Sequence, residues 1–305
     1  MSSKRGTLIV VVGPTGSGKT ALAIELARHY HAPIISTDSR QVYRGMAIGT
    51  AQPTAEELAA ATHYFIADRE PEAEFNCGRY EVEALALLER LFAEGDYVVA
   101  VGGSGLYIKA LCEGMDELPE ADEQVRAELK RRLTDEGLES LVRELEERDA
   151  RYARIVDRQN PARVMRALEV CIATGRPYSE QRRGERAERP FNIVKIGTDI
   201  ARELLYERID RRVDMMVADG LVEEVRRLYS KRALNALQTV GYRELFDAFD
   251  GLMTIEEAIE LIKRNSRRYA KRQLTWFRRD CDVAWFAPSS VEAIIEYIDS
   301  RVERE

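Results

Sequence analysis

The sequence predicts a doubly wound α/β fold built on a parallel sheet, with a helical segment inserted into it. The apolar runs Leu8–Val12 and Tyr97–Val101 are typical of strands buried on both faces of such a sheet. Stretches with helical periodicity lie between these runs, which favours alternating strands and helices. After Met115 the strand pattern stops, and apolar residues recur at helical intervals. A chain of 305 residues is long enough for a large core and a smaller helical unit.

The first hundred residues contain most of the predicted core. The expected elements are a strand over Leu8–Val12, a helix over Lys19–Tyr30, a strand over Pro33–Thr37, a helix over Glu81–Phe92 and a strand over Tyr97–Val101. Ligands of parallel sheets bind at the carboxyl ends of the strands. Three polar or glycine-rich loops leave those ends and are therefore candidates for the binding site: Gly13–Thr20, Asp38–Tyr43 and Gly102–Tyr107.

The predicted insertion is all-helical and spans residues 117–190, so that residues 1–116 and 191–305 form the core. Within the insertion, Asn160 is expected to cap a helix that has Pro161 at its first position and Gly175 at its end. Arg182–Arg189 is expected to be a charged, exposed stretch. Phe191–Thr198 returns to a strand pattern, and we expect residues 199–305 to be helices that complete the core.

Composition excludes several classes of protein. No run of 18 apolar residues is present, so no transmembrane helix and no membrane partner are expected. The polar N-terminus lacks the pattern of a secretory signal, which predicts a cytoplasmic location. The four cysteines are isolated and are not spaced with the histidines as zinc ligands, so no structural metal is expected. Nothing in the sequence demands more than a monomer.

The charge of the chain is unevenly distributed. A net charge of −7 argues against a uniformly basic protein, yet residues 151–190 carry ten arginines against five acidic residues. Residues 263–279 hold eight basic side chains and no acidic one, and we expect phosphate contacts in both segments. The second segment also contains Tyr269, Trp276 and Phe277, which either stack on bases or pack into the core. We expect these rings to point mostly inward and the cations outward.

The segment GPTGSGKT matches the P-loop pattern G-x-x-x-x-G-K-[ST] between a strand and a helix, which predicts a P-loop NTPase-like core. Its glycines let backbone N–H groups close on phosphate oxygens, and the helix N-terminus adds partial positive charge. Lys19 would supply a positive charge to a diphosphate, and the Thr20 hydroxyl is the candidate ligand of Mg²⁺. The predicted phosphate-binding residues are Gly13, Pro14, Thr15, Gly16, Ser17, Gly18, Lys19 and Thr20.

A P-loop alone is typical of an ATP-binding kinase or ATPase. Those proteins usually have a later strand that ends in an acidic residue, whereas the strand at Tyr97–Val101 is followed here by Gly102–Gly105. The acidic residue at a strand end is Asp38, which either accepts a proton from an attacking group or only forms a turn. Ser104, between two glycines, either donates to a phosphate oxygen or only forms a turn. The residues alone leave both alternatives open.

Six motifs in this order carry a resemblance to a known family. They are GPTGSGKT (13–20), DSRQVYRGMAIGTAQP (38–53), GGSGLY (102–107), NPARVMRALEV (160–170), LYERIDRRVDMMVADGLVEEV (205–225) and TVGYRE (239–244). Together they closely resemble the bacterial tRNA dimethylallyltransferases, also called tRNA isopentenyltransferases, over nearly the whole chain. The resemblance implies transfer of a five-carbon allyl group from dimethylallyl diphosphate, with Mg²⁺, to the exocyclic amine of the adenosine immediately 3′ of the tRNA anticodon.

The resemblance also implies roles for particular residues. The implied catalytic residues are Asp38, Ser104 and Arg212. Asp38 would hydrogen-bond the amine and take its proton, and Arg212 would meet the diphosphate. Ser104 stands where the family usually has threonine, and its hydroxyl would act on the diphosphate or near the amine. Arg208 and Arg211 lie close enough in sequence to compete with Arg212 for that role. The residues that match tRNA-contacting positions are Asp38, Ser39, Arg40, Gln41, Ser104, Arg126, Gln159, Asn160, Pro161, Ala162, Arg163 and Arg166. Taken alone, the arginines of this set would be read as solvated helix surface.

Three rival functions remain. A P-loop small-molecule kinase would use ATP, and the absence of an acid-terminated strand counts against it. An adenylate isopentenyltransferase would perform the same transfer on free AMP, whereas the arginine-rich segment 151–190 favours an RNA acceptor, expected to be the anticodon stem-loop. A protein that only binds tRNA would keep its function when Lys19 is replaced.

Overall fold

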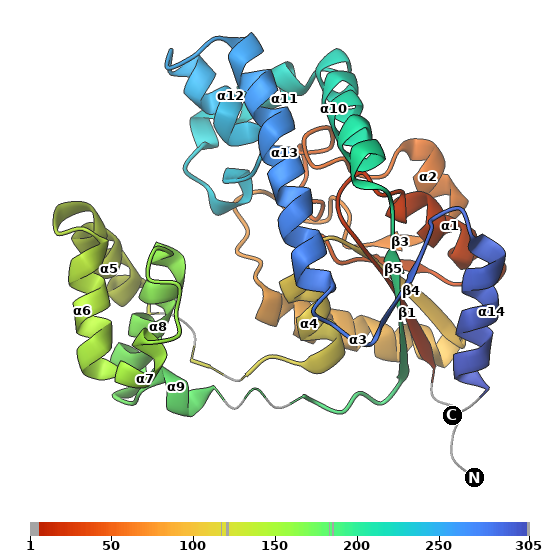
Figure 1. The fold of residues 1–305 in the computed structure, drawn as a ribbon, viewed down its shortest axis with the longest axis horizontal. Coiled ribbons are helices and arrows are strands. Elements are labelled where there is room, and N and C mark those ends of the chain that lie inside the picture. Colours follow the sequence, from red (N-terminus) through yellow and green to blue (C-terminus); the bar gives the residue numbers. More distant parts are fainter. Residues whose placement is uncertain (1–5, 117, 120–121, 183, 185, 304–305) are drawn as a thin grey trace. The chain divides into compact units, whose positions relative to one another are not determined.

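The computed structural model describes residues 6–116, 118–119, 122–182, 184 and 186–303. It contains two compact units, one formed by Met1–Cys112 with Glu188–Glu305 and the other by Glu113–Ala187. Among the described residues, no helix is long and apolar enough to cross a bilayer. The first unit is the α/β core and the second consists of helices (Figure 1).

The core is organised around one parallel sheet, as predicted. Its six strands lie in the order β3 (His63–Tyr64), β2 (Ile34–Ser36), β4 (Tyr97–Gly102), β1 (Thr7–Val12), β5 (Asn192–Thr198) and β6 (Val283–Phe286). Every pairing is parallel, and Val10 at the centre of β1 lies opposite Ala100 on one side and Lys195 on the other. All carboxyl ends therefore meet along one edge of the sheet.

Helices cover both faces of this sheet. Ile9 and Val11 of β1 point to the face covered by α1 (Lys19–His29) and α14 (Val291–Val302). Leu8, Val10 and Val12 point to the opposite face, where α3 (Cys77–Glu94) and α4 (Gly105–Glu113) pack. A continuous apolar run was expected for a strand with helices on both sides, and β1 is buried along its whole length.

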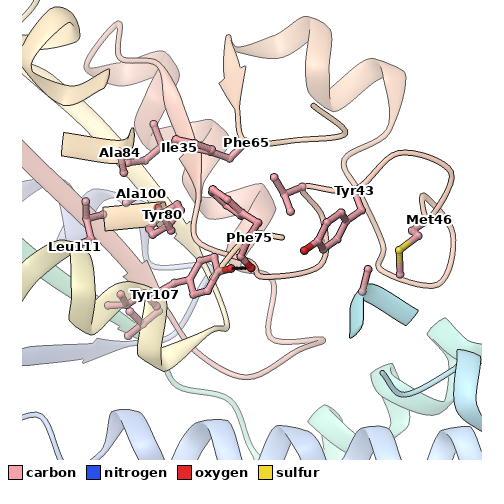
Figure 2. Packing of buried hydrophobic residues seen from close by; sticks show 14 of the residues in the cluster. Ile35, Tyr43, Met46, Phe65, Phe75, Tyr80, Ala84, Ala100, Tyr107 and Leu111 are labelled. Carbon is pink, nitrogen blue, oxygen red and sulfur yellow. Dashed lines mark hydrogen bonds between the residues drawn. The ribbon is translucent and has the colours of Figure 1, made fainter. Parts of the chain in front are cut away.

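An aromatic cluster connects this core to the loop after β2. Phe75, Tyr80 and Tyr107 pack against one another between α3 and α4, and the Tyr107 hydroxyl donates to the Phe75 carbonyl at 3.2 Å (Figure 2). Tyr43 and Met46 belong to the same buried cluster (Figure 2). The core thus extends beneath the polar loop that begins at Asp38 and gives that loop a packed support.

Several boundaries differ from the predicted ones. Helix α3 begins at Cys77, four residues before the expected start, because the Asn76 side chain caps it by accepting from Gly78 and Arg79 N–H groups. The loop expected over Gly102–Tyr107 ends early, since α4 begins at Gly105. Strands β3 and β6 were missed, because two and four residues are too few to show a period. Residues 199–305 therefore contain a strand as well as helices.

Four helices between β5 and β6 stand beside the carboxyl edge of the sheet. They are α10 (Arg202–Ala218), α11 (Leu221–Leu228), α12 (Tyr242–Phe249) and α13 (Ile255–Phe277), with α2 (Ala55–Ala60) and the short 3₁₀ helices Tyr229–Lys231 and Asn235–Leu237 nearby in the same unit. α13 contacts both α10 and α12 along its length (Figure 1). The inner faces of α10 and α13 are consequently available to line a site above the sheet.

The helical unit has a hydrophobic core of its own. It contains α5 (Glu123–Asp135), α6 (Leu138–Arg148), α7 (Ala150–Ala153), α8 (Pro161–Thr174) and α9 (Tyr178–Gln181). Leu129, Leu141 and Leu168 are buried among these helices. The predicted caps of α8 are confirmed, because the Asn160 side chain accepts from the Arg163 N–H and Gly175 is left-handed with φ of 68°.

The predicted exposed stretch Arg182–Arg189 is wrong at its last residue. Arg189 is 9% exposed in its side chain, pairs with Glu81 at 2.6 Å and donates to the carbonyl groups of Ala110 and Leu111. A guanidinium can be buried where a carboxylate and carbonyl groups satisfy its donors. Arg183 and Glu185 lie outside the described residues.

Candidate active site

The P-loop adopts the conformation that the glycine pattern requires. Gly16 and Gly18 have φ of 81° and 90°, and α1 begins directly after Gly18. A Cβ on Gly13 would lie 2.0 Å from the Thr198 hydroxyl at the end of β5. That hydroxyl forms a 2.6 Å hydrogen bond with Ser17, whose side chain is therefore buried against the strand rather than turned toward a ligand. β5 anchors the loop from below.

A pocket opens at the carboxyl edge of the sheet, beside this loop. Its polar residues come from the ends of β1, β2 and β4, from the start of α1, and from α10 and α13: Thr15, Lys19, Thr20, Ser36, Asp38, Gly102, Gly103, Arg212, Ser266, Tyr269 and Gln273. Its apolar wall comes mainly from α10 and its neighbours: Ile209, Val213, Met216, Leu221, Val240 and Ile262. A polar half and an apolar half suit an amphipathic ligand.

Two cationic side chains converge in the polar half. Burial, and after it the neighbouring Arg212 guanidinium, lower the pKa of Lys19 to about 7, and Asp38 only partly opposes this shift. Burial also lowers the pKa of Arg212, against the effect of Asp38. The Lys19 ammonium donates to the Pro14 carbonyl at 2.7 Å. The two cations repel each other beside the P-loop N–H groups. Binding of a polyanion at this site would relieve that repulsion and lower the free energy.

The structure distinguishes among the three candidate arginines on α10. Arg212 lines the pocket, and its Nη1 donates to the Thr15 hydroxyl of the P-loop at 3.2 Å. Arg208 and Arg211 are exposed and do not line the pocket. Arg211, one residue before Arg212, lies on a different face of the helix. Arg208, one turn before, shares the side of Arg212, but its exposed guanidinium lies beside Gly18, 3.9 Å from where a Cβ would be, and does not line the pocket.

Asp38 lines the same pocket and uses one oxygen to shape its own loop. Its Oδ1 accepts from the backbone N–H groups of Arg40 at 2.8 Å and Gln41 at 3.3 Å. Within the described part of the chain, no hydrogen bond reaches Oδ2. The turn role and the chemical role therefore belong to different oxygen atoms, and the loop holds the free oxygen in place.

Ser104 does not reach the pocket with its side chain in this structure. Its Oγ accepts from the Ser39 N–H at 3.0 Å and donates to the Ser39 hydroxyl at 3.2 Å. It is absent from the residues that line the pocket, whereas the preceding Gly102 and Gly103 are present. Ser104 thus joins the turn after β4 to the loop that carries Asp38.

Two buried residues support the site and were missed from the sequence. The Glu224 carboxylate accepts from the N–H groups of Ile48 and Gly49 and from the Tyr242 hydroxyl at 2.6–2.9 Å. The Gln273 amide contacts the P-loop and the turn after β4. Glu224 lies within the motif 205–225, but that pattern does not single it out, since its contacts with Ile48 and Gly49 span more than 170 positions. Gln273 lies in none of the six motifs.

The aromatic residues on α13 divide between core and surface. Phe277 is buried and Tyr269 lines the pocket, as the inward expectation requires, but Trp276 is 41% exposed. Burial, and next the Asp38 carboxylate, raise the pKa of Tyr269 to about 12, so its hydroxyl keeps its proton at neutral pH. The expectation that these rings point mostly inward is thus wrong for Trp276.

The arginines predicted to contact RNA in the helical unit differ in their surroundings. The buried Glu169 carboxylate accepts from Arg126 Nε at 3.1 Å and lies 3.5 Å from Arg166 Nη1. Arg166 also donates to the Pro119 carbonyl. Arg163 is exposed and forms no ion pair with the described residues. Gln159 and Ala162 are likewise exposed, next to the half-buried Asn160 and Pro161 at the start of α8.

Fold and pocket define a P-loop α/β protein with an anion site beside an apolar chamber. A match to the family described as IPP transferase covers residues 41–280. The tRNA dimethylallyltransferase of Cytophaga hutchinsonii is 49% identical over 296 residues, which cover 97% of each chain. That of Christiangramia forsetii is 47% identical over 296 residues, covering 97% of this chain and 98% of the relative.

Solved structures agree. The tRNA isopentenylpyrophosphate transferase of Bacillus halodurans superposes with a TM-score of 0.74 at 38% identity and covers 98% of each chain. A eukaryotic dimethylallyltransferase acting on tRNA gives a TM-score of 0.78 at 24% identity, over 94% of this chain and 75% of that one, which shows a shared fold. The chain belongs to the IPP transferase family of tRNA dimethylallyltransferases, which confirms the resemblance found in the six motifs.

Proposed function

We propose that the chain transfers the dimethylallyl group of dimethylallyl diphosphate to the exocyclic amine of the adenosine immediately 3′ of the tRNA anticodon, with release of diphosphate. Family membership supports the activity. The observation that carries the assignment of residues is one pocket lined by Lys19, Arg212 and Asp38, whose charges interact, together with apolar side chains. This arrangement has a place for the leaving group, the allyl group and the attacking amine.

Departure of the diphosphate is the demanding part of the reaction. The exocyclic amine is a weak nucleophile because its lone pair is delocalised into the purine, so the allyl carbon has to become strongly electrophilic. As the C–O bond breaks, negative charge grows on the diphosphate, where Lys19, Arg212 and the P-loop N–H groups stabilise it. The new C–N bond places a positive charge on the amine, and Asp38 Oδ2 takes the surplus proton.

A bound Mg²⁺ would add positive charge at the diphosphate and help it leave. Thr20 lines the pocket one residue after Lys19 and fits as the protein ligand. No cluster of three His, Cys, Asp or Glu side chains that could hold a metal occurs in the described residues. This donor set fits an ion held largely by diphosphate oxygens and water, which is how Mg²⁺ commonly binds.

The apolar wall suits the five-carbon group. Ile209, Val213 and Met216 lie on one face of α10, in the same pocket as Arg212. Their side chains keep water away from the allyl carbon while it carries positive charge, so that the amine rather than water captures it. This role follows from an apolar surface that adjoins the anion site.

Transfer RNA is the proposed acceptor, and its adenosine has to leave the stack to enter the pocket. We assign its contacts to Asp38–Gln41 in the core and to Gln159–Arg163, Arg126 and Arg166 in the helical unit. The exposed Arg163 at the start of α8 suits a contact with the phosphate backbone. Ser104, bonded to Ser39, would act by shaping this loop.

Incubation with dimethylallyl diphosphate, Mg²⁺ and unmodified tRNA tests the function directly. We expect nucleoside mass analysis to find one adenosine carrying the five-carbon group and diphosphate to be released in equal amount. Two parallel reactions test the rival functions. In one, free AMP replaces tRNA as the acceptor, and in the other, ATP is supplied with small acceptor molecules. Prenylation of AMP at the rate seen with tRNA would support an adenylate isopentenyltransferase, and formation of ADP would support a kinase.

A further inference from the structure

Gln273 joins two of the three loops at the carboxyl edge of the sheet. Gln273 lies on α13, is 6% exposed and lines the pocket. Its Oε1 accepts from the Thr15 N–H in the P-loop at 2.9 Å. Its Nε2 donates to the Gly103 carbonyl, in the turn after β4, at 2.9 Å. One side-chain amide thus uses its acceptor on one loop and its donor on the other.

Glycines in the turn after β4 leave space for this side chain. A Cβ on Gly103 would lie 2.1 Å from Gln273 Nε2, a distance that side chains do not reach. A Cβ on Gly105 would similarly lie 2.2 Å from Trp276 Nε1, one turn further along α13. The glycines after β4 therefore let α13 approach the backbone closely, and this approach brings the amide between the two loops.

The contacts continue from Gly103 to the proposed proton acceptor. Gly103 precedes Ser104, whose hydroxyl accepts from the Ser39 N–H at 3.0 Å. Ser39 follows Asp38, and the next two N–H groups hold Asp38 Oδ1. A short series of hydrogen bonds therefore runs from the loop proposed to hold the diphosphate to the loop that carries Asp38, and Gln273 is its first member.

We propose that Gln273 is a positioning residue that sets the spacing between the leaving group and the proton acceptor during transfer. The proposal rests on the proposed function of this pocket. Gln273 does not act on the reacting atoms in this role. It holds the P-loop and the turn after β4 at the separation that lets the allyl carbon meet the amine, and small errors in such a separation can cost roughly 100-fold in rate.

The chemistry of the amide provides a test that packing alone would not pass. Methionine at position 273 keeps the length of the side chain but forms neither hydrogen bond. Glutamate keeps the acceptor for Thr15 and loses the donor for Gly103 when ionised, which leaves a carboxylate against a carbonyl. A protonated glutamate regains a donor, so it mimics glutamine. Burial and the facing carbonyl should raise the pKa of such a carboxyl group, against the Thr15 N–H and the neighbouring Tyr269 hydroxyl, which favour its ionised form.

The experiment compares wild type, Q273E and Q273M between pH 6 and pH 8.5, with tRNA and dimethylallyl diphosphate saturating. For each variant, kcat is divided by the wild-type kcat at the same pH. This ratio cancels the effects of the titration of Lys19 and of the substrate, which both proteins share. We expect Q273M to lose roughly 10- to 100-fold at every pH. We expect Q273E to lose as much at pH 8.5 and to recover toward wild type as the pH falls.

T275V is the matched control, because Thr275 is exposed on the same helix and, among the described residues, its hydroxyl bonds only to the Lys271 carbonyl of that helix. We expect its kcat to equal that of wild type. The proposal is overturned if Q273M keeps its kcat while its melting temperature falls, or if Q273E shows the same ratio to wild type at all pH values. Wild-type transfer to tRNA, measured in the same series, tests the proposed function separately.

Discussion

Arg212 and Thr15 meet through a hydrogen bond of 3.2 Å between the guanidinium Nη1 and the threonine hydroxyl. The contact joins α10 to the P-loop across 197 positions of sequence and turns the guanidinium into the pocket. A planar guanidinium can bond the hydroxyl and still offer further N–H groups to a phosphate oxygen, whereas an ammonium presents a single point of charge.

The first prediction follows from that geometry. R212K should lower kcat by roughly 100-fold, because removal of one preorganised donor from developing negative charge typically has this effect. R211K, at the exposed neighbouring position, should leave kcat unchanged. Single-turnover transfer of labelled dimethylallyl group to tRNA is the measurement. Equal rates for R212K and wild type would show that the guanidinium of Arg212 is not needed to stabilise the leaving group.

Asp38 provides the second prediction. D38A should abolish transfer, since no other carboxylate lines the pocket among the described residues, while tRNA affinity changes by only a few-fold. D38N keeps the Oδ1 contacts of the turn and should therefore fold like wild type yet remain inactive. Filter binding of tRNA and melting curves complete the set. Normal turnover by D38N would show that proton transfer to Asp38 is not part of the reaction.

The third prediction concerns pH. In the free pocket, burial and Arg212 lower the pKa of Lys19 to about 7, so that the amine is largely neutral at pH 8. A bound diphosphate favours the ammonium and raises that pKa, so binding at pH 8 should take up a proton. Affinity for dimethylallyl diphosphate should consequently fall as the pH rises above about 7. Below that pH Lys19 is already protonated, so its titration should not change the affinity further.

Calorimetry in buffers of different ionisation enthalpy measures this uptake. At pH 8 the substrate itself is ionised, and the K19M variant provides the baseline, since it lacks the titrating amine. We expect close to one proton per site for wild type and none for K19M. The same buffer dependence in both proteins would mean that another group titrates on binding.

The fourth prediction concerns the two kinds of arginine in the helical unit. R163A should weaken tRNA binding and reduce the salt slope by about 1, because an exposed cation that contacts phosphate releases counterions. R126A should change the slope less, since Glu169 already neutralises part of that charge. R143A, on exposed α6 surface outside the predicted contact set, is the control. If R163A leaves the salt slope unchanged, Arg163 does not contact tRNA phosphate.

The fifth prediction tests the support under the Asp38 loop. A Cβ on Gly49 would lie 2.5–2.8 Å from the Tyr242 ring, which Glu224 holds through a 2.6 Å hydrogen bond. G49A should therefore destabilise the fold by about 1–3 kcal/mol through overpacking. G95A has open space around its Cβ and should be neutral. Thermal unfolding compares them, and equal melting temperatures would contradict a tight fit at Gly49.

Local patterns predicted much of the fold and part of the site. β1 and the P-loop are contiguous in sequence, so an apolar run and a glycine pattern suffice to find them. The ion pair of Arg166 with Glu169 is also readable, because residues three apart share a helix face. By contrast, the inward side chain of Ser17 depends on Thr198, which lies 181 positions away.

Contacts between distant residues explain what the sequence could not predict. Arg189 lies in a run of charges that is typical of exposed surface, yet Glu81 and two carbonyl groups draw it inward. Arg212 could not be separated from Arg208 and Arg211 until the orientation of α10 was known. Gln273 has no motif at all, since its role depends on meeting Thr15 across 258 positions.

That last separation has a consequence for biosynthesis. Gln273 on α13 is synthesised 258 positions after Thr15 of the P-loop. A nascent chain can therefore form β1 and the glycine turn without any helix to brace them. Because Gln273 bonds to both loops, the spacing between the P-loop and the turn after β4 is fixed only once α13 docks.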